Sequence, residues 1–351
     1  LKNTFCLGKG GHAFVSHHIG DLENYETYRS YTEGITHFTR LFDVDPALVA
    51  HDLHPEYLST KYAQELAGVD LLGVQHHHAH IASCLADNGE AGPVIGVAFD
   101  GLGLGTDGTI WGGEFLVADL TGFARHGHLA PVPLPGGTAA ITQPWRMAAA
   151  HLDAAFDGAV PDDLAVVRRN SAQWATVLSV AHAGVNSPLT SSAGRLFDAV
   201  AAILGVRDRI NYEGQAAVEL EQLADRSTVD GYPARLTAAP GAAPFVVQAG
   251  DLVRAVVEDR AAGTAVPTVA ARFHRGVAGV IAAGAERIRS ATGLDTVALS
   301  GGVFQNLLLL GATVDLLTER GFRVLTHHRV PTNDGGLSLG QAAVAGATDA
   351  S

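Results

Sequence analysis

The chain has 351 residues, of which 47% are apolar and 17% charged, and this length and composition suit a globular protein of about two domains. Its 23 Lys and Arg residues against 36 Asp and Glu give a net charge of −13, which argues against a protein that mainly coats nucleic acid. Two cysteines exclude a disulfide scaffold and suit a reducing cytosol, and no apolar run reaches the ~20 residues of a membrane span. These features predict a cytoplasmic protein.

The first third of the chain alternates apolar runs with helical patterns. Gly8-Lys9-Gly10-Gly11 can supply the positive φ of a hairpin turn. Tyr28, Tyr31 and Ile35 recur at three- and four-residue steps, which places them on one helix face. The expected elements are a hairpin over 4–16, a helix over 28–42, a strand over 49–53, a helix from Pro55 to 66, a strand over 71–75, a helix to 85, and strands over 94–100 and 109–119 around a glycine-rich turn at 101–108.

The rest of the chain is predicted to be mostly helical from Gly136 to about 229, with a connecting segment over 232–244 that is rich in Ala, Pro and Gly. The expected elements after it are helices over 251–262 and 266–291, a strand over 296–300, a helix to 317, a strand over 322–326 and a last helix from 337. Strands alternate with helices at both ends of the chain, and glycine turns follow strands. This pattern predicts an α/β fold with binding loops at strand ends.

The densest polar feature is the tract Gln75-His76-His77-His78-Ala79-His80. In a helix, His76 and His80 lie one turn apart on the same face, and such a pair suits a transition metal. The alternative is a solvated or nucleic-acid-facing run of histidines, which the apolar residues on both sides of the tract disfavour.

Two aspartates are candidates to complete this metal site. Asp100 and Asp334 each follow a predicted strand, where α/β folds place ligands, although each alone is also explained as a turn or helix-cap residue. Two histidines with two aspartates would suit Fe(II), Mn(II) or Zn(II).

Three glycine-rich turns could face phosphate: 101–105, Gly112-Gly113 and 301–306. The last follows a strand and starts a helix, so its free N–H groups would meet an anion. No P-loop or dinucleotide motif is present, and the turns together suggest a nucleotide in a cleft, although each alone is a common turn. The alternative for Arg195 and Asp198 is a surface ion pair of little energy.

Ten segments carry a resemblance to a known family. They are Asp21-Leu22-Glu23-Asn24, His51-Asp52-Leu53-His54-Pro55, Val74-Gln75-His76-His77-His78-Ala79-His80, Phe99-Asp100-Gly101-Leu102-Gly103, Trp111-Gly112-Gly113-Glu114, Gln143-Pro144-Trp145-Arg146, 192–198, Tyr212-Glu213-Gly214-Gln215, 301–306 and Asp334-Gly335-Gly336. In this order they resemble the C-terminal, Kae-like half of the hydrogenase maturation carbamoyltransferases, the HypF family.

The resemblance implies a fold, domains and site residues. The fold would be two RNase-H-like lobes of the actin-like ATPase (ASKHA) type with a nucleotide and metal cleft between them. The first lobe would span 1–139, with 336–351 packing back on it, and the second 140–335. The implied metal ligands, for Fe or Zn, are His76, His80, Asp100 and Asp334. The implied nucleotide-binding residues are Gly112, Gly113, Arg195, Asp198, Glu213, Gly214, Gly301, Gly302 and Asn306, with Mg²⁺ as a further candidate beside the nucleotide.

The implied reaction moves a carbamoyl group from carbamoyl adenylate to the C-terminal cysteine thiolate of a partner, HypE, with release of AMP. The product leads to the cyanide ligands of the nickel–iron site. The YrdC-like domain that makes carbamoyl adenylate from carbamoyl phosphate and ATP, and the paired CxxC zinc segments, are not found in this sequence, which starts at Leu1. We therefore expect an excised domain, or a stand-alone form fed by another protein.

Two other functions remain open from the sequence. One is an O- or N-carbamoyltransferase that acts on a small molecule or tRNA, of which the acidic charge disfavours the tRNA version. The other is a non-catalytic actin-like nucleotide switch or metal-carrying scaffold. A switch needs no histidine pair, so His76 and His80 argue against it.

Overall fold

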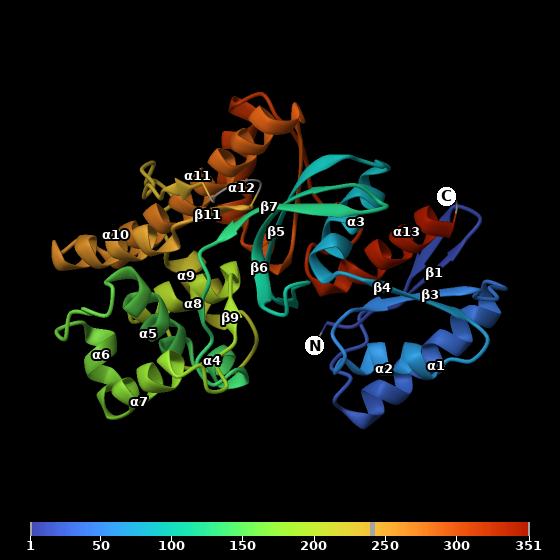
Figure 1. Ribbon diagram of the computed structural model, residues 1–351, viewed down its shortest axis with the longest axis horizontal. Helices are drawn as coiled ribbons and strands as arrows, with labels where there is room; N and C mark the ends of the chain where they lie inside the picture. Colours follow the sequence, from blue (N-terminus) through green and yellow to red (C-terminus); the bar gives the residue numbers. More distant parts are fainter. Residues whose placement is uncertain (1, 239–242, 350–351) are drawn as a thin grey trace.

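The computed structural model describes residues 2–238 and 243–349. Figure 1 shows two parts: the N-terminal segment in blue with the last helix in red beside it, and a larger part that holds the main sheet and most helices. This α/β architecture confirms the predicted fold class. Every helix in the described part of the chain is too short or too polar to span a membrane.

The N-terminal part consists of short strands and two helices. Its elements are β1 (Cys6–Lys9), β2 (His12–Val15), α1 (Tyr25–Leu41), β3 (Leu48–Asp52), α2 (Leu58–Glu65) and β4 (Asp70–Val74). Strands β1 and β2 form the predicted hairpin, whose turn residues Gly10 and Gly11 have φ of 55° and 78°. Strands β3 and β4 pair in parallel. Phe5, Tyr31 and Phe38 pack edge to face in the small core of this part.

The main sheet runs through the larger part. Its path is β10-β11-β7-β6-β5-β12-β13, with β8 and β9 attached at its side. The strands are β5 (Val94–Leu104), β6 (Ile110–Ala118), β7 (Phe123–Leu129), β8 (Val132–Pro133), β9 (Leu189–Thr190), β10 (Leu236–Thr237), β11 (Phe245–Val247), β12 (Thr296–Ser300) and β13 (Arg323–Leu325). Strand β5 is antiparallel to β6 and parallel to β12, so it lies inside the sheet.

Helices cover this sheet and build the largest apolar core. They are α3 (His76–Asn88), α4 (Thr138–Thr142), α5 (Pro144–Ala155), α6 (Ala165–Arg169), α7 (Ser171–His182), α8 (Ala193–Ile203), α9 (Gln215–Leu223), α10 (Ala249–Ala261), α11 (Val266–Thr292), α12 (Leu307–Glu319) and α13 (Leu337–Asp349), with 3-10 turns at Gly302–Gln305 and Asp334–Gly336. Phe99 on β5, Phe197 on α8 and Phe273 on α11 belong to one buried cluster.

Helix α13 packs against α3 and against β1 and β3, which joins the last helix to the N-terminal part (Figure 1). The predicted division into 1–139 and 140–335 stays a prediction. The main sheet joins strands from both sides of residue 139.

Two local predictions were wrong, and the strands β7 to β11 were not predicted. The segment 101–108 is not all turn, because β5 continues to Leu104 and pairs with Trp111 and Ile110 after a bulge. The turn itself starts at Gly105, whose N–H donates to Thr109 O at 2.8 Å. Helix α2 begins at Leu58 and not at Pro55. Strand β7 was missed, because its sequence FARHGHL shows no apolar alternation. Residues 239–242 of the predicted connecting segment lie outside the described residues.

Candidate metal and nucleotide site

Helix α3 places the two histidines of the predicted pair on one face. The Gln75 side chain caps the helix by accepting the His78 N–H at 2.9 Å, so His76 starts the first turn. His80 follows one turn later, and both side chains are almost fully buried. A Cβ on Gly103 would lie 2.7 Å from the His76 ring, so glycine on β5 leaves room for the imidazole.

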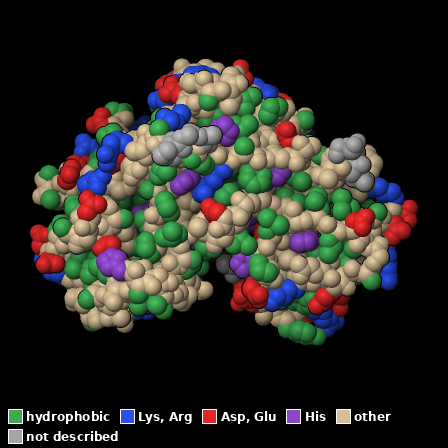
Figure 2. Space-filling model, in the orientation of Figure 1, with side chains coloured by type: hydrophobic (Ala, Val, Ile, Leu, Met, Phe, Trp, Pro, Cys, Tyr) green, Lys and Arg blue, Asp and Glu red, His purple; other side chains and the backbone are tan. Residues whose placement is uncertain are grey.

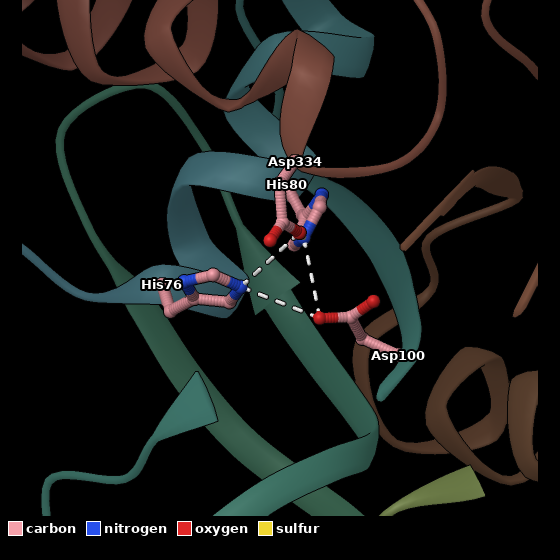
Figure 3. A group of neighbouring side chains, drawn as sticks. All are labelled: His76, His80, Asp100 and Asp334. Atoms are coloured by element: carbon pink, nitrogen blue, oxygen red, sulfur yellow. Dashed lines mark hydrogen bonds and ion pairs between the residues drawn. The ribbon is translucent and has the colours of Figure 1, made fainter. Parts of the chain in front are cut away.

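Two carboxylates converge on these imidazoles (Figure 3). His76 Nε2 lies 3.3 Å from Asp100 Oδ2 and 3.8 Å from Asp334 Oδ1. The corresponding distances from His80 Nε2 are 3.6 Å and 3.5 Å. One ligand atom from each of the four residues lies within 4.8 Å of the others. The structure therefore brings together all four residues that were predicted as metal ligands.

The donor set fits a transition metal. Two imidazole nitrogens with two carboxylate oxygens suit Fe, Mn or Zn. His80 Nε2 is buried and has no hydrogen-bond partner among the described residues. An unpartnered buried nitrogen is expected of a metal ligand. The cap of the turn before α13 is Asn333, whose Oδ1 accepts the Gly335 N–H at 2.9 Å, so Asp334 is not needed for capping.

The charges in this cluster shift one another's protonation. Burial alone would lower the pKa of His76, but the carboxylates of Asp52 and Asp100 raise it well above its usual value. Burial alone would raise the pKa of Asp100, but His76 and His80 lower it well below its usual range. Asp100 is therefore an anion, the form that binds a cation.

Asp52 is a site residue that the sequence analysis did not assign. It is buried at the end of β3, and its Oδ2 lies 2.7 Å from His76 Nδ1, so it orients the ring and leaves Nε2 for a ligand. Its other oxygen accepts the His54 N–H at 2.8 Å. The His54 ring stacks on Tyr57 at 4.2 Å, and Tyr57 lines the cleft beside the cluster. The available signal was the position of Asp52 near the end of a predicted strand within the quoted motif. The same signal marked Asp100, which in the structure lies inside β5.

A cleft of about 1,760 Å³ opens beside this cluster, between the N-terminal part and the larger part. Figure 2 shows the surface notched between the two halves of the molecule. Predicted site residues that line the cleft are His76, Asp100, Arg195, Asp198, Glu213, Gly214, Gly302, Asn306 and Asp334. Most of the predicted metal and nucleotide residues thus face one space.

Arg195 and Asp198 do not form the surface ion pair that was the alternative interpretation of their spacing. Their Nη2 and Oδ2 atoms lie 2.9 Å apart and both side chains are buried, because α8 is buried along its length. This ion-pair contact does not have hydrogen-bond geometry, so neither carboxylate oxygen of Asp198, nor Arg195 Nε, has a hydrogen-bond partner among the described residues. Burial raises the pKa of Asp198 to about 6 despite the Arg195 charge. This pair therefore keeps hydrogen-bonding capacity beside the cleft.

Three residues that were predicted to bind a nucleotide line the cleft and also make contacts within the protein. The Gly302 N–H donates to Asp100 Oδ1 at 2.8 Å. Asn306 caps α12 by accepting the Leu309 N–H at 2.9 Å, and its Nδ2 donates to His274 Nε2 at 2.8 Å. Glu213 lies 3.5 Å from Lys2 Nζ. Their predicted contacts with a nucleotide stay predictions.

Gly112, Gly113 and Gly301 do not line the cleft. Each lies against neighbouring backbone: a Cβ on Gly112 would lie 2.7 Å from Asp100 O, and those on Gly113 and Gly301 would overlap Ser191 O and Phe99 O. Close packing explains these glycines, and the structure offers no support for their predicted contact with a nucleotide.

Two family models match the chain over most of its length. Residues 1–87 match the HypF Kae1-like domain, and residues 96–341 match the second subdomain of the Kae1-like domain of carbamoyltransferases. The chain belongs to the HypF family. This finding confirms the resemblance inferred from the motifs.

Curated HypF proteins are similar along nearly the whole chain. Carbamoyltransferase HypF2 of Cupriavidus necator is 41% identical over 98% of this chain and 45% of its own length. Carbamoyltransferase HypF of Rhodobacter capsulatus is 42% identical over 99% of this chain and 46% of its own length. The chain thus spans about half the length of these relatives. It covers 89% of a HypF homolog from Cupriavidus necator, with 39% identity.

Two solved HypF structures share this fold. A full-length HypF in the phosphate- and nucleotide-bound form superposes with a TM-score of 0.92 at 43% identity, over 98% of this chain and 53% of that chain. The HypF of T. kodakarensis superposes with a TM-score of 0.86 at 31% identity, over 100% of this chain and 46% of that chain.

Proposed function

We propose that this HypF-family chain transfers a carbamoyl group from carbamoyl adenylate to the C-terminal cysteine thiolate of a HypE-like partner and releases AMP. One observation carries the proposal: the metal-type donors His76, Asp100 and Asp334 and the buried Arg195–Asp198 pair line the same cleft. The names of the relatives support carbamoyl transfer, and the nucleotide-bound HypF structure supports a nucleotide in the reaction.

The site has to orient the reactants more than it has to activate them, because the carbamoyl–phosphate anhydride is already an activated acyl donor. The thiolate sulfur forms a bond to the carbamoyl carbon, the bond from that carbon to the phosphate oxygen breaks, and AMP leaves with the electron pair. Written from the thiolate, this step moves no proton; the acceptor thiol has to lose its proton before the attack. Holding both reactants in register contributes much of the rate.

Side chains of the cleft can bind and orient the reactants. Arg195 offers a buried positive charge, with a free Nε–H, to the phosphate of the adenylate. His76, His80, Asp100 and Asp334 would hold one divalent ion, for which Fe or Zn is the expected identity. When bound, such an ion supplies a positive charge that polarises an oxygen of the substrate. Asp52 keeps His76 in the orientation that this requires.

Two further parts of the proposal concern other proteins. We expect the carbamoyl adenylate to come from a YrdC-like, adenylate-forming activity. We expect the thiocarboxamide on the partner's cysteine to lead to the cyanide ligands of a nickel–iron site, as hydrogenase maturation requires.

The test is to mix the metal-loaded chain with carbamoyl adenylate and a HypE-like protein, and to measure the acceptor by mass spectrometry. We expect a gain of roughly 43 Da on the C-terminal cysteine, the mass of a carbamoyl group that replaces hydrogen. His80→Ala should lose both bound metal and transfer, and His126→Ala, on β7 and outside the cluster, should lose neither. Modification of a hydroxyl compound or tRNA but not of the thiol would favour the alternative transferases. Nucleotide binding without any transfer would favour a switch.

A further inference from the structure

A buried carboxylate on α3 binds the segment that leads to Asp334. Asp87 lies seven residues after His80, and its side chain is fully buried. Its Oδ2 accepts the N–H groups of His328 at 2.6 Å and Arg329 at 3.0 Å, and its Oδ1 lies 3.2 Å from the Arg329 nitrogen. One carboxylate therefore holds two successive peptide groups by charge-assisted hydrogen bonds.

Two neighbours of Asp87 on α3 bind the same segment at its ends. Asn88 Nδ2 donates to Thr326 O at 2.9 Å, and Ser83 Oγ donates to Gly336 O at 2.7 Å. Residues 326–336 contain no strand or α-helix, apart from the 3-10 turn Asp334–Gly336. The side chain of Asp334 is 41% exposed, and its position depends on these contacts with α3 together with two hydrogen bonds between Thr332 and Gly301.

A third side chain joins β12 to this arrangement. His327 Nε2 lies 2.8 Å from Ser300 Oγ, and His327 Nδ1 lies 3.9 Å from Asp87 Oδ2. The set Ser300, His327 and Asp87 has the residue types of a nucleophilic triad, but Ser300 is fully buried and does not line the cleft, so no substrate reaches it. Burial lowers the pKa of His327 to about 4, so the ring is neutral. Its Nε2 meets Ser300 Oγ, but its Nδ1 has no hydrogen-bond partner among the described residues. His327 therefore joins the segment to the end of β12 through Ser300, and Asp87 holds the next two residues from α3.

The helix that carries both imidazoles thus also binds the segment that carries the fourth ligand. We propose that Asp87 is a positioning residue of the metal centre, which fixes residues 326–336 so that Asp334 reaches His76 and His80. This inference rests on the proposed function, because it takes the four-residue cluster to be a metal site. It adds a residue outside the four-residue cluster that no motif singled out, although Asp87 also lines the cleft.

The test measures metal binding without any turnover. Asp87→Asn keeps the shape of the side chain but replaces one acceptor oxygen with a donor NH₂ group, which faces a peptide N–H. In a titration of the purified chain with Co²⁺, followed by its visible absorption, we expect Asp87→Asn to weaken the affinity about 10–100-fold and to change the absorption spectrum. The affinity for AMP should stay within about twofold, because Asp198 and Arg195 are on α8.

The matched control is Asp119→Asn. The Asp119 carboxylate also accepts two peptide N–H groups, from Thr121 at 2.7 Å and Gly122 at 2.9 Å, but it holds the turn between β6 and β7. Asp119 meets His78 of α3 only through its main-chain oxygen, which the substitution leaves in place. We expect this variant to keep the wild-type Co²⁺ affinity and spectrum. If Asp87→Asn does not fold, Ser83→Ala removes only the contact with Gly336 and should weaken Co²⁺ binding about 3–10-fold.

The possible results separate the two claims. Wild-type Co²⁺ affinity and spectrum in Asp87→Asn, or in Ser83→Ala where that variant is used, would overturn the inference and leave the proposed function standing. Equal losses in Asp87→Asn and Asp119→Asn would show a general effect of stability and would also overturn it. A wild-type chain that binds no Co²⁺ would overturn the proposed metal site and the inference together.

Discussion

Replacing Gly340 on α13 with alanine should move α3, which carries His76 and His80, away from α13 and from Asp334 before it. This glycine packs against α3 at Ala79 and Ser83. A Cβ built on it would lie 2.7 Å from Ser83 N and would overlap the carbonyl oxygen of Ala79. Both neighbours are backbone atoms of α3, so no side chain can turn aside. Gly340→Ala must therefore push the two helices apart.

The size of that shift follows from ordinary contact distances. Moving Ser83 N from 2.7 Å to an ordinary 3.4 Å needs at least about 0.7 Å, and the overlap with Ala79 O requires more. Ligand distances in metal sites vary by only about 0.2 Å, and Asp334 lies just before α13 whereas His76 and His80 are on α3. We therefore expect Gly340→Ala to lower Co²⁺ affinity at least tenfold and to cost about 1–3 kcal/mol of unfolding free energy.

The assay combines urea unfolding with Co²⁺ titration, and Gly346→Ala is the matched control on the same helix. No atom lies within 4 Å of a Cβ on Gly346. Alanine there should stabilise the helix by about 0.5–1 kcal/mol and leave metal binding unchanged. Equal stabilities of the two variants, with full Co²⁺ affinity in Gly340→Ala, would refute the argument that this contact sets the ligand geometry.

Three other variants test single contacts. Asp52→Asn should weaken Co²⁺ binding about 10–100-fold in a titration, because the charge that orients His76 is lost, and unchanged affinity would contradict that role. Burial lowers the pKa of His151 to about 4, below the 6.5 of an exposed histidine, so the unfolded chain takes up its proton first and stability falls as the pH drops below about 6.5. Between pH 7.5 and 5, urea unfolding of His151→Gln should lose about 2 kcal/mol less than the wild type, and parallel curves would argue against a buried neutral ring. Asn306→Ala should cost about 1–2 kcal/mol in the same assay, because the α12 cap and the bond to His274 are lost; wild-type stability would mean that the amide is free for a ligand.

The metal-type cluster could be predicted because its signals are local. Helical spacing alone places His76 and His80 on one face. Asp100 and Asp334 were found from predicted strand ends, although in the structure Asp100 lies inside β5 and Asp334 lies nine residues after the end of β13. Asp52 was missed as a site residue because its partner lies 24 residues away on another element, and no spacing rule links the end of β3 to the first turn of α3.

Depth in the fold was harder to predict than position along the chain. The spacing of Arg195 and Asp198 shows that they share a helix face, but it does not show that α8 is buried. The alternative interpretation therefore placed this pair on the surface. Glycine gave an ambiguous signal for the same reason. Gly112 and Gly301 follow the pattern of phosphate turns, and the structure explains them by close contact with Asp100 O and Phe99 O. Sequence patterns distinguish faces well, but burial depends on what packs opposite.

The hydrogen bond between Ser83 and Gly336 joins residues that are 253 positions apart. During synthesis, the helix with both imidazoles therefore leaves the ribosome long before the carboxylate that completes the set. Contacts of such long sequence separation form late and slowly in folding. The proposed metal site would consequently be assembled only after residue 334 has been translated, so a chain stalled before that residue has two histidines and one aspartate of the set but not the fourth residue.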